Sequence, residues 1–139
     1  MSAEENKAAV RRLNEAVNKA DWSVLPEHFA PNYVSHGFAA EDVKGLEGVK
    51  QSFTGMRTAF PDYQEKIEYM VAEGDLVAVF YTLTGTFKGE MAGIAPTGKQ
   101  MSAPCAVLAR FENGKQVEAW LYMNTLALYQ QLGIKPPGG

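Results

Sequence analysis

The sequence is poor in the residues that build disulfides and metal sites. Its 139 residues include one cysteine, Cys105, and two histidines, His28 and His36. One cysteine cannot form a disulfide within the chain, which is usual for proteins of a reducing cytoplasm. The two histidines and the cysteine also lack the spacing of zinc ligands. We therefore expect a cytoplasmic protein without a metal site, in which Cys105 is a small buried hydrophobic residue. We expect His28, on the helix between Leu25 and Phe29, to lie at the surface or at an interface.

Basic clusters, long apolar runs and phosphate-binding loops are missing as well. Thirteen basic and sixteen acidic residues give a net charge of -3 without a basic block, which argues against nucleic acid as a partner. No apolar run approaches the roughly 18 residues of a membrane span, and residues 1–10 lack the order of a signal peptide. What remains is 46% hydrophobic and 21% charged, a composition typical of a globular protein. The length predicts a single domain, residues 1–139.

The first part of the chain has the periodicity of helices. Ser2 and Glu5 form a capping box before a first helix. Asp21 can cap a second, short helix, which Pro31 ends. A third helix fits residues 46–60, where the apolar residues share one stripe. Three helices therefore precede everything that follows.

From Tyr63 onward the apolar residues recur at every second position, as in strands. Asn113-Gly114 between two such runs is a strong hairpin signal. A last helix covers about 125–132 and stops at Gly133. Three helices followed by long antiparallel strands predict an α+β fold, with the segment 32–36 as an edge strand or a bend. A strongly curved sheet can wrap around the helices, and its concave face is then the natural ligand site.

The last strand has two different faces. Val117, Ala119, Leu121 and Met123 alternate with a row made of Glu118, Trp120, Tyr122 and Asn124. Aromatic surface with polar tips is the lining expected of a small-molecule pocket. We therefore expect the row that contains Trp120 to face the ligand, although ordinary packing explains any single aromatic residue equally well.

Several segments together resemble a known family. They run in that family's order and cover about residues 5–135: "RRLNEAVNKADWSVLPEHFAPNYVSHG", "GLEGVKQSFTGMRTAFPDY", "GTFKGEMAGIAPTGK", "RFENGKQVEAW" and "LALYQQLG". The chain resembles the SnoaL-like polyketide cyclase (ester cyclase) branch of the NTF2-like superfamily. The resemblance implies an α+β cone with a deep apolar pocket, usually in a homodimer packed through the sheets.

The resemblance also implies a chemistry. Polyketide members of the family close a ring by intramolecular aldol condensation without metal or cofactor, and an aspartate four residues after the tryptophan of "E-x-W" is their general acid/base. This chain has Asn124 at that position, and Phe87 where many members have a histidine. An amide does not titrate near neutral pH, so Asn124 can only donate or accept a hydrogen bond, toward a developing oxyanion or as the cap of the last helix.

Other residues remain as candidates for the proton transfer. A histidine has an unperturbed pKa of about 6.5, so His36 suits proton exchange at neutral pH, or it simply holds its bend in place. Glu118 would have a raised pKa against the indole of Trp120, or it pairs across the strands with Arg110 or Lys115. The candidate catalytic residues are thus His36, Asn124 and Glu118. The candidate substrate-binding residues are Tyr33, Tyr81, Phe87, Trp120 and Tyr122.

Two hypotheses of function follow. The first is a cofactor-independent cyclase or isomerase, which enolises a hydrophobic polyketide- or terpenoid-like molecule and closes or shifts it. The alternative is a non-catalytic protein that binds a small hydrophobic molecule and has lost the family's aspartate. Whether the chain is an enzyme stays open at this point, because Asn124 and Phe87 replace two residues that carry chemistry in the family.

Overall fold

The computed structural model describes residues 2–37 and 41–135. Helix α1 (Ala3–Asn18) starts at the predicted capping box, in which the Ser2 hydroxyl accepts a hydrogen bond from the Glu5 amide at 3.1 Å. Asp21 caps a 3-10 turn (Trp22–Val24) that continues into α2 (Leu25–His28). Helix α3 (Gly45–Ala59) follows, and α4 (Thr125–Leu132) ends at Gly133 with a φ of 71°. The four predicted helical segments are present, but the short second one ends at His28, and Pro31, which was predicted to end it, lies within the strand Phe29–His36.

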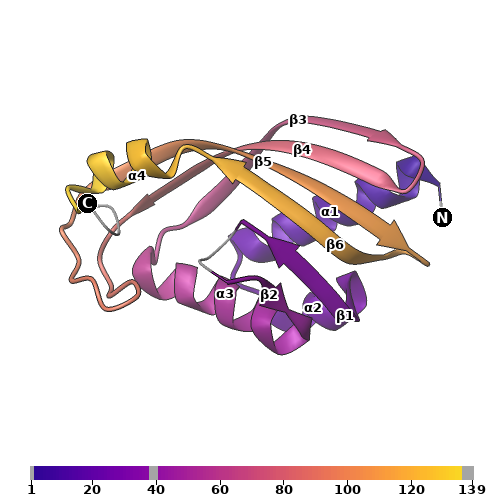
Figure 1. The fold of residues 1–139 in the computed structure, drawn as a ribbon, viewed down its shortest axis with the longest axis horizontal. Coiled ribbons are helices and arrows are strands. Elements are labelled where there is room, and N and C mark those ends of the chain that lie inside the picture. The colour runs from indigo at the N-terminus through magenta and orange to yellow at the C-terminus, as the bar shows by residue number, and fades with distance from the viewer. Residues whose placement is uncertain (1, 38–40, 136–139) are drawn as a thin grey trace.

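One six-stranded sheet contains all the strands of the described residues. They are β1 (Phe29–His36), β2 (Val43–Lys44), β3 (Gln64–Glu73), β4 (Leu76–Thr86), β5 (Gln100–Glu112) and β6 (Lys115–Met123). Their order is β2-β1-β6-β5-β4-β3, and the predicted α+β architecture is confirmed (Figure 1). The hairpin β5–β6 turns at Asn113-Gly114, where φ is 51° and 80°, because both central residues of this tight turn need positive φ.

The first strand differs from the prediction for residues 32–36. It is neither an edge strand nor a bend, since β1 lies between β2 and β6 and runs parallel to β6. The other strand pairs are antiparallel. The parallel pair joins the N-terminal half of the chain to its last strand, and it brings His36 opposite Trp120.

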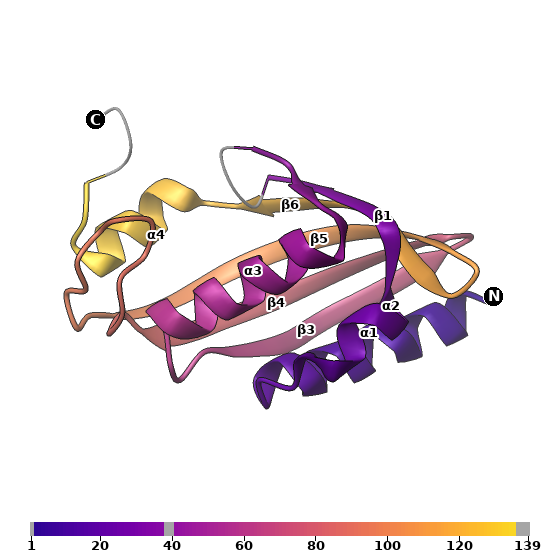
Figure 2. The ribbon, with the colours of Figure 1, turned by 90° about the horizontal axis from the view of Figure 1, so that it is seen from below.

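The helices cover one face of the curved sheet, called the inner face below (Figure 2). Helix α1 packs against β3 and β4, whereas α3 packs against β1 and β2 and α4 against β5. Two asparagines of α1 bind the backbone at the start of β3: the side-chain amides of Asn14 and Asn18 donate to the Glu65 carbonyl at 2.8 and 3.0 Å. The Asn18 side-chain oxygen accepts from the Glu65 amide at 2.7 Å, so this end of β3 is fixed to the helix.

Candidate functional site

The last strand presents the opposite face from the one predicted. Ala119 is buried and Leu121 and Met123 pack against the core under the helices, whereas Tyr122 is 66% exposed on the outer face. The expectation that Trp120 and its row line the inner face is therefore wrong. The physical reason is ordinary alternation: the small and aliphatic side chains fill the space against the helices, and the row with polar tips meets solvent.

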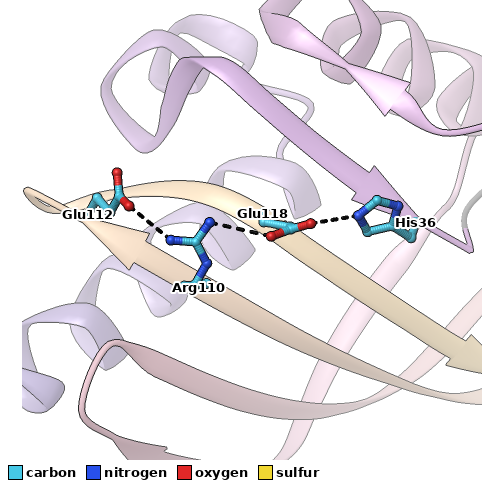
Figure 3. Close-up of polar contacts among 4 residues, drawn as sticks. All are labelled: His36, Arg110, Glu112 and Glu118. Carbon is cyan, nitrogen blue, oxygen red and sulfur yellow. Dashed lines mark hydrogen bonds and ion pairs between the residues drawn. The ribbon is translucent and has the colours of Figure 1, made fainter.

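The structure brings two of the three candidate catalytic residues together, on this outer face. The Nε2 atom of His36 lies 2.8 Å from Oε2 of Glu118, and Nδ1 lies 2.9 Å from Oδ2 of Asp42. The other oxygen of Glu118, Oε1, accepts from Arg110 at 3.3 Å, and Arg110 also binds Glu112 at 2.9 Å (Figure 3). Both ring nitrogens of His36 and both oxygens of Glu118 are therefore occupied.

These contacts set the charges of the network. The hydrogen bond that His36 donates to Glu118, followed by the contacts with Asp42, raises the pKa of His36 above its ordinary value. The bond to His36 and then that to Arg110 lower the pKa of Glu118. The prediction that Trp120 raises the pKa of Glu118 is wrong, and the predicted cross-strand pair with Arg110 is confirmed. The imidazole of His36 lies between the carboxylates of Glu118 and Asp42, an arrangement that favours its protonated form.

Asn124 lies away from this pair and is the N-cap of α4. Its side-chain oxygen accepts a hydrogen bond from the Ala127 amide at 3.0 Å. This is the capping role that the sequence left open beside a role in chemistry. Asn124 also borders an apolar hollow of about 660 Å³ on the outer face, together with Tyr69, Phe80 and Tyr122.

The aromatic residues predicted to bind substrate are divided between the two faces. Tyr33 and Phe87 are buried in the core, and Phe87 packs on Phe60 with 5.6 Å between ring centroids. Tyr81 points to the inner face but keeps some exposed surface. Trp120 and Tyr122 lie on the outer face, where Tyr122 and Tyr81 both line the hollow of about 660 Å³.

Half-buried apolar side chains mark one part of the inner face. They pack against the core under the helices and still reach solvent, and we call them the inner patch: Tyr81, Val107, Leu121 and Met123 from the sheet, with Phe53 and Met56 from α3. By contrast, the inner residues Val77, Val79 and Ala109 near α1 are sealed. These half-buried side chains are the less tightly sealed apolar part of the inner face, and two of them, Tyr81 and Met123, also line the hollow of about 660 Å³.

Sequence reasoning missed a carboxyl group on this same face. Glu65 in β3 is enclosed by protein, and the Tyr63 hydroxyl donates to its Oε1 atom at 2.8 Å. Within the described residues no donor binds its other oxygen, Oε2, and the side chain is not sealed from solvent. The alternation of Tyr63, Glu65 and Ile67 could have shown that Glu65 shares the face of two apolar residues.

Burial controls the protonation of the groups around Glu65. Desolvation raises the pKa of the Glu65 carboxyl, while the Tyr63 hydrogen bond and the charge of Arg57 act in the opposite direction. Desolvation, with the nearby Glu65 charge, also raises the pKa of Tyr81, and it raises that of Cys105 to about 12. Such a carboxyl is suited to exchange protons closer to neutral pH than an exposed one.

Two further predictions concern residues outside these clusters. Cys105 is buried, as predicted. His28 was expected at the surface or at an interface, but within the chain it is only 6% exposed, lies 2.7 Å from Gln116 and packs edge-on against Phe29 and Phe111. The short helix α2 lies against β6 and carries His28 inward. Desolvation lowers the pKa of His28 to about 4, so it is neutral in the fold.

The described part of the chain has neither a cluster of metal ligands nor a membrane-spanning helix. Residues 2–37 and 41–135 contain no group of three or more His, Cys, Asp or Glu side chains that could hold a metal ion. None of the described helices is both long enough and apolar enough to cross a membrane.

Comparison with known proteins identifies the family. The family model of the SnoaL-like polyketide cyclases matches residues 7–132. The chain belongs to this family. Aklanonic acid methyl ester cyclase AcmA of Streptomyces galilaeus is a similar SnoaL-like protein, 29% identical over 131 residues, which are 93% of this chain and 91% of that protein.

Solved structures of SnoaL-like proteins have the same fold. AclR of Streptomyces galilaeus, a proposed hydroxylase, superposes with a TM-score of 0.83 at 35% identity, over 97% of this chain and 100% of AclR. IdmH of Streptomyces antibioticus, a proposed polyketide cyclase, superposes with a TM-score of 0.79 at 28% identity, over 93% of this chain and 99% of IdmH. The predicted family and the predicted cone-like fold are confirmed.

Proposed function

We propose that the protein is a cofactor-independent cyclase, which closes a ring in a hydrophobic polyketide-like substrate by an intramolecular aldol reaction. The observation that carries this proposal is membership of the SnoaL-like family together with the likeness to an aklanonic acid methyl ester cyclase over 93% of the chain. The inner patch supports it, because half-buried aromatic and thioether side chains suit a planar, apolar ligand.

The reaction asks little of the protein beyond position and proton transfer. One group removes a proton from a carbon next to a carbonyl, and a donor stabilises the oxyanion that develops. The new carbon–carbon bond then forms within one molecule, so the product is an isomer of the substrate. No redox partner enters the balance.

Turnover of a defined substrate tests the proposal. The purified protein is incubated with aklanonic acid methyl ester, and with simpler linear polyketides that carry the same pattern of carbonyl groups, in the presence of a chelator. We expect a cyclic product of unchanged mass to accumulate faster than in buffer, measured by liquid chromatography and mass spectrometry. Equal rates with and without protein, for every substrate of the panel, would contradict cyclase activity.

A second candidate function is hydroxylation. The likeness to AclR, at 35% identity over 97% of the chain, favours it. This reaction needs molecular oxygen and a reductant, and its product is heavier by one oxygen atom. The same assay under air with added reduced flavin or nicotinamide therefore separates the two functions by the mass of the product.

We also propose that two copies pair through the outer faces of their sheets. Several large apolar side chains are exposed there, including Tyr69 at 73%, Phe80 at 44% and Tyr122 at 66%. They surround the apolar hollow of about 660 Å³, and exposed apolar patches of this kind mark interfaces. Light scattering should give the mass of a dimer for the wild type and of a monomer for Phe80→Glu. Leu126→Glu, a matched change at an exposed residue of α4, should leave the dimer intact; a monomeric wild type would refute the pairing.

We place the protein in the cytoplasm. The single cysteine, Cys105, is in keeping with this location, because disulfide-forming pairs are rare in proteins of a reducing compartment.

A further inference from the structure

We propose that Glu65 is the catalytic residue that carries the proton in the ring closure, with its free oxygen turned to a substrate on the inner patch. This inference rests on the proposed cyclase function, and it replaces the candidates taken from the sequence. Three observations lead to it: the enclosure of the carboxyl, the state of its two oxygens, and the neighbours it shares with the inner patch.

The carboxyl is held in a defined place. The Tyr63 hydroxyl donates to Oε1 at 2.8 Å, and the backbone of Glu65 is bound on both sides by Asn14 and Asn18 of α1. A proton-transfer group must be fixed by such contacts if it is to meet the reacting carbon in a productive geometry. In the described part of the chain Oε2 has no donor, so one oxygen remains for a ligand.

The neighbours of Glu65 belong to the inner patch or border it. Tyr81 and Cys105 lie close enough for the Glu65 charge to affect their ionisation, and in the sheet Tyr81 pairs with Cys105, which pairs with Met123. Across the strands Glu65 pairs with Leu83 and Ile67 with Tyr81. Glu65 and Tyr81 are therefore diagonal neighbours, and a ligand that covers Tyr81 lies beside Glu65. The Tyr81 hydroxyl makes no hydrogen bond with any described residue, and it can donate to the oxygen of such a ligand.

Arg57 supplies a positive charge without neutralising the carboxyl. Its guanidinium lies 6.0 Å from the centre of the Tyr63 ring, and its two terminal nitrogens donate to the carbonyls of Pro61 and Val17. Its Nε atom is buried and has no partner in the described part of the chain. The charge favours the carboxylate form of Glu65, and also the negative charge that develops on an enolate beside it.

The residues predicted from the sequence are less suited to this role. Glu118 and His36 lie on the outer face and bind each other. Glu118 also binds Arg110, and His36 also binds Asp42, so their polar atoms are already paired. The outer carboxyl of Glu118 also ionises more readily than usual, which makes it a weak base. Asn124 uses its oxygen as a helix cap.

The step balances with Glu65 alone. The carboxylate takes a proton from the carbon next to a carbonyl; the C–H bond breaks and its electron pair forms the enolate, whose oxygen Tyr81 can bind. The enolate carbon attacks the second carbonyl carbon of the same molecule and forms a C–C bond. The π electron pair of that carbonyl moves onto its oxygen, which becomes an alkoxide. That oxygen takes the proton back from Glu65, which returns to the carboxylate form.

The position of Glu65 predicts the pH dependence of turnover. The titratable and charged groups around it are Tyr63, Tyr81, Cys105 and Arg57, together with Arg11 and Glu15 of α1, which line one surface groove with Glu65. Burial raises the pKa of Glu65, so the active carboxylate is lost on acidification already above the ordinary value of 4.5. Tyr63→Phe removes a hydrogen bond that lowers this pKa, and the acidic limb of the rate profile should move to higher pH.

The decisive experiment compares Glu65→Gln with Glu73→Gln and Tyr63→Phe. Glu73 lies in the same strand and is exposed, so it is a matched control for the change from carboxyl to amide. With the substrate that the wild type converts, we expect Glu65→Gln to lose about 100-fold or more in kcat and Glu73→Gln to keep it. Circular dichroism and thermal unfolding check that Glu65→Gln is folded; if it is not, the shift of the acidic limb in folded Tyr63→Phe decides the question.

The outcomes separate this inference from the function on which it rests. An active wild type with an active, folded Glu65→Gln variant overturns the role of Glu65 and leaves the cyclase function standing. An active wild type whose acidic limb stays in place in Tyr63→Phe overturns it as well. A wild type that converts no substrate of the panel overturns the proposed function, and the role of Glu65 with it.

Discussion

Asn124 offers a direct test of whether the chain lost an acid or gained a cap. In the wild type the Ala127 amide donates to the Asn124 side-chain oxygen at 3.0 Å, and Asn124→Ala removes this acceptor. Loss of an N-cap costs typically about 1 kcal/mol of unfolding free energy. Helix α4 is attached to the fold by the fully buried Leu132 and by Gln131, which binds both backbone groups of Ser102, so the cost should appear in global unfolding.

The matched variant Asn124→Asp keeps the cap. Its carboxylate accepts the same amide and adds a negative charge at the N-terminus of α4, which stabilises helices by about 0.3–1 kcal/mol. For a protein of this size we expect Asn124→Ala to melt about 3 °C below the wild type, and Asn124→Asp at or above it. Scanning calorimetry and urea titration measure both differences.

Turnover of the same two variants completes the test. Because the Asn124 side-chain oxygen accepts a hydrogen bond from the first turn of α4, we expect little change in kcat for either variant. A gain of about tenfold or more in Asn124→Asp would show that position 124 reaches the substrate, and would refute the assignment as a cap alone. An Asn124→Ala variant as stable as the wild type would refute the prediction that the Asn124 cap stabilises the fold.

Three further predictions concern the core and the two histidines. Phe87→Ala should lower the unfolding free energy by about 3–5 kcal/mol in urea titration, since the ring is fully buried against Phe60; a loss below about 1 kcal/mol would mean that the surroundings collapse into the space. His28 has a pKa of about 4 in the fold against 6.5 when exposed, so its contribution to stability is complete above pH 6.5 and is lost toward pH 4, by up to roughly 3 kcal/mol; His28→Gln should flatten this slope. His36 behaves in the opposite sense: its raised pKa adds stability that is complete below pH 6.5 and lost as pH rises through the folded pKa, which an NMR titration of its ring should place above 6.5.

The fold could be predicted from local signals because they agreed with one another. The capping box at Ser2, the hairpin at Asn113-Gly114 and the stop at Gly133 each fix a boundary through the backbone of a few residues. The place of β1 could not be predicted in this way. Its partner β6 is distant in the sequence, and no turn residue between them records a parallel pairing.

The site was harder to predict for a different reason. Which face of β6 meets the helices depends on what the other strands contribute, and the aromatic row at Trp120 looked like a lining although the aliphatic row fills the core. Glu65 escaped notice because a glutamate in an alternating strand is usually exposed. Its enclosure follows from Tyr63 beside it and from the helix that covers β3, neither of which the local pattern shows.

The parallel pairing of β1 with β6 also has a consequence for how the protein is made. His36 and Glu118 are 82 positions apart in the chain, and the ribosome releases the first long before the second. Until β6 emerges, β1 has only the two-residue strand β2 as a partner in the sheet. Contacts this distant in sequence are slow to form, because the whole intervening loop must close first. The nascent chain therefore has an unpaired edge on β1 through most of its synthesis. The last strand to be made, β6, then inserts between β1 and β5 and joins the two parts of the sheet.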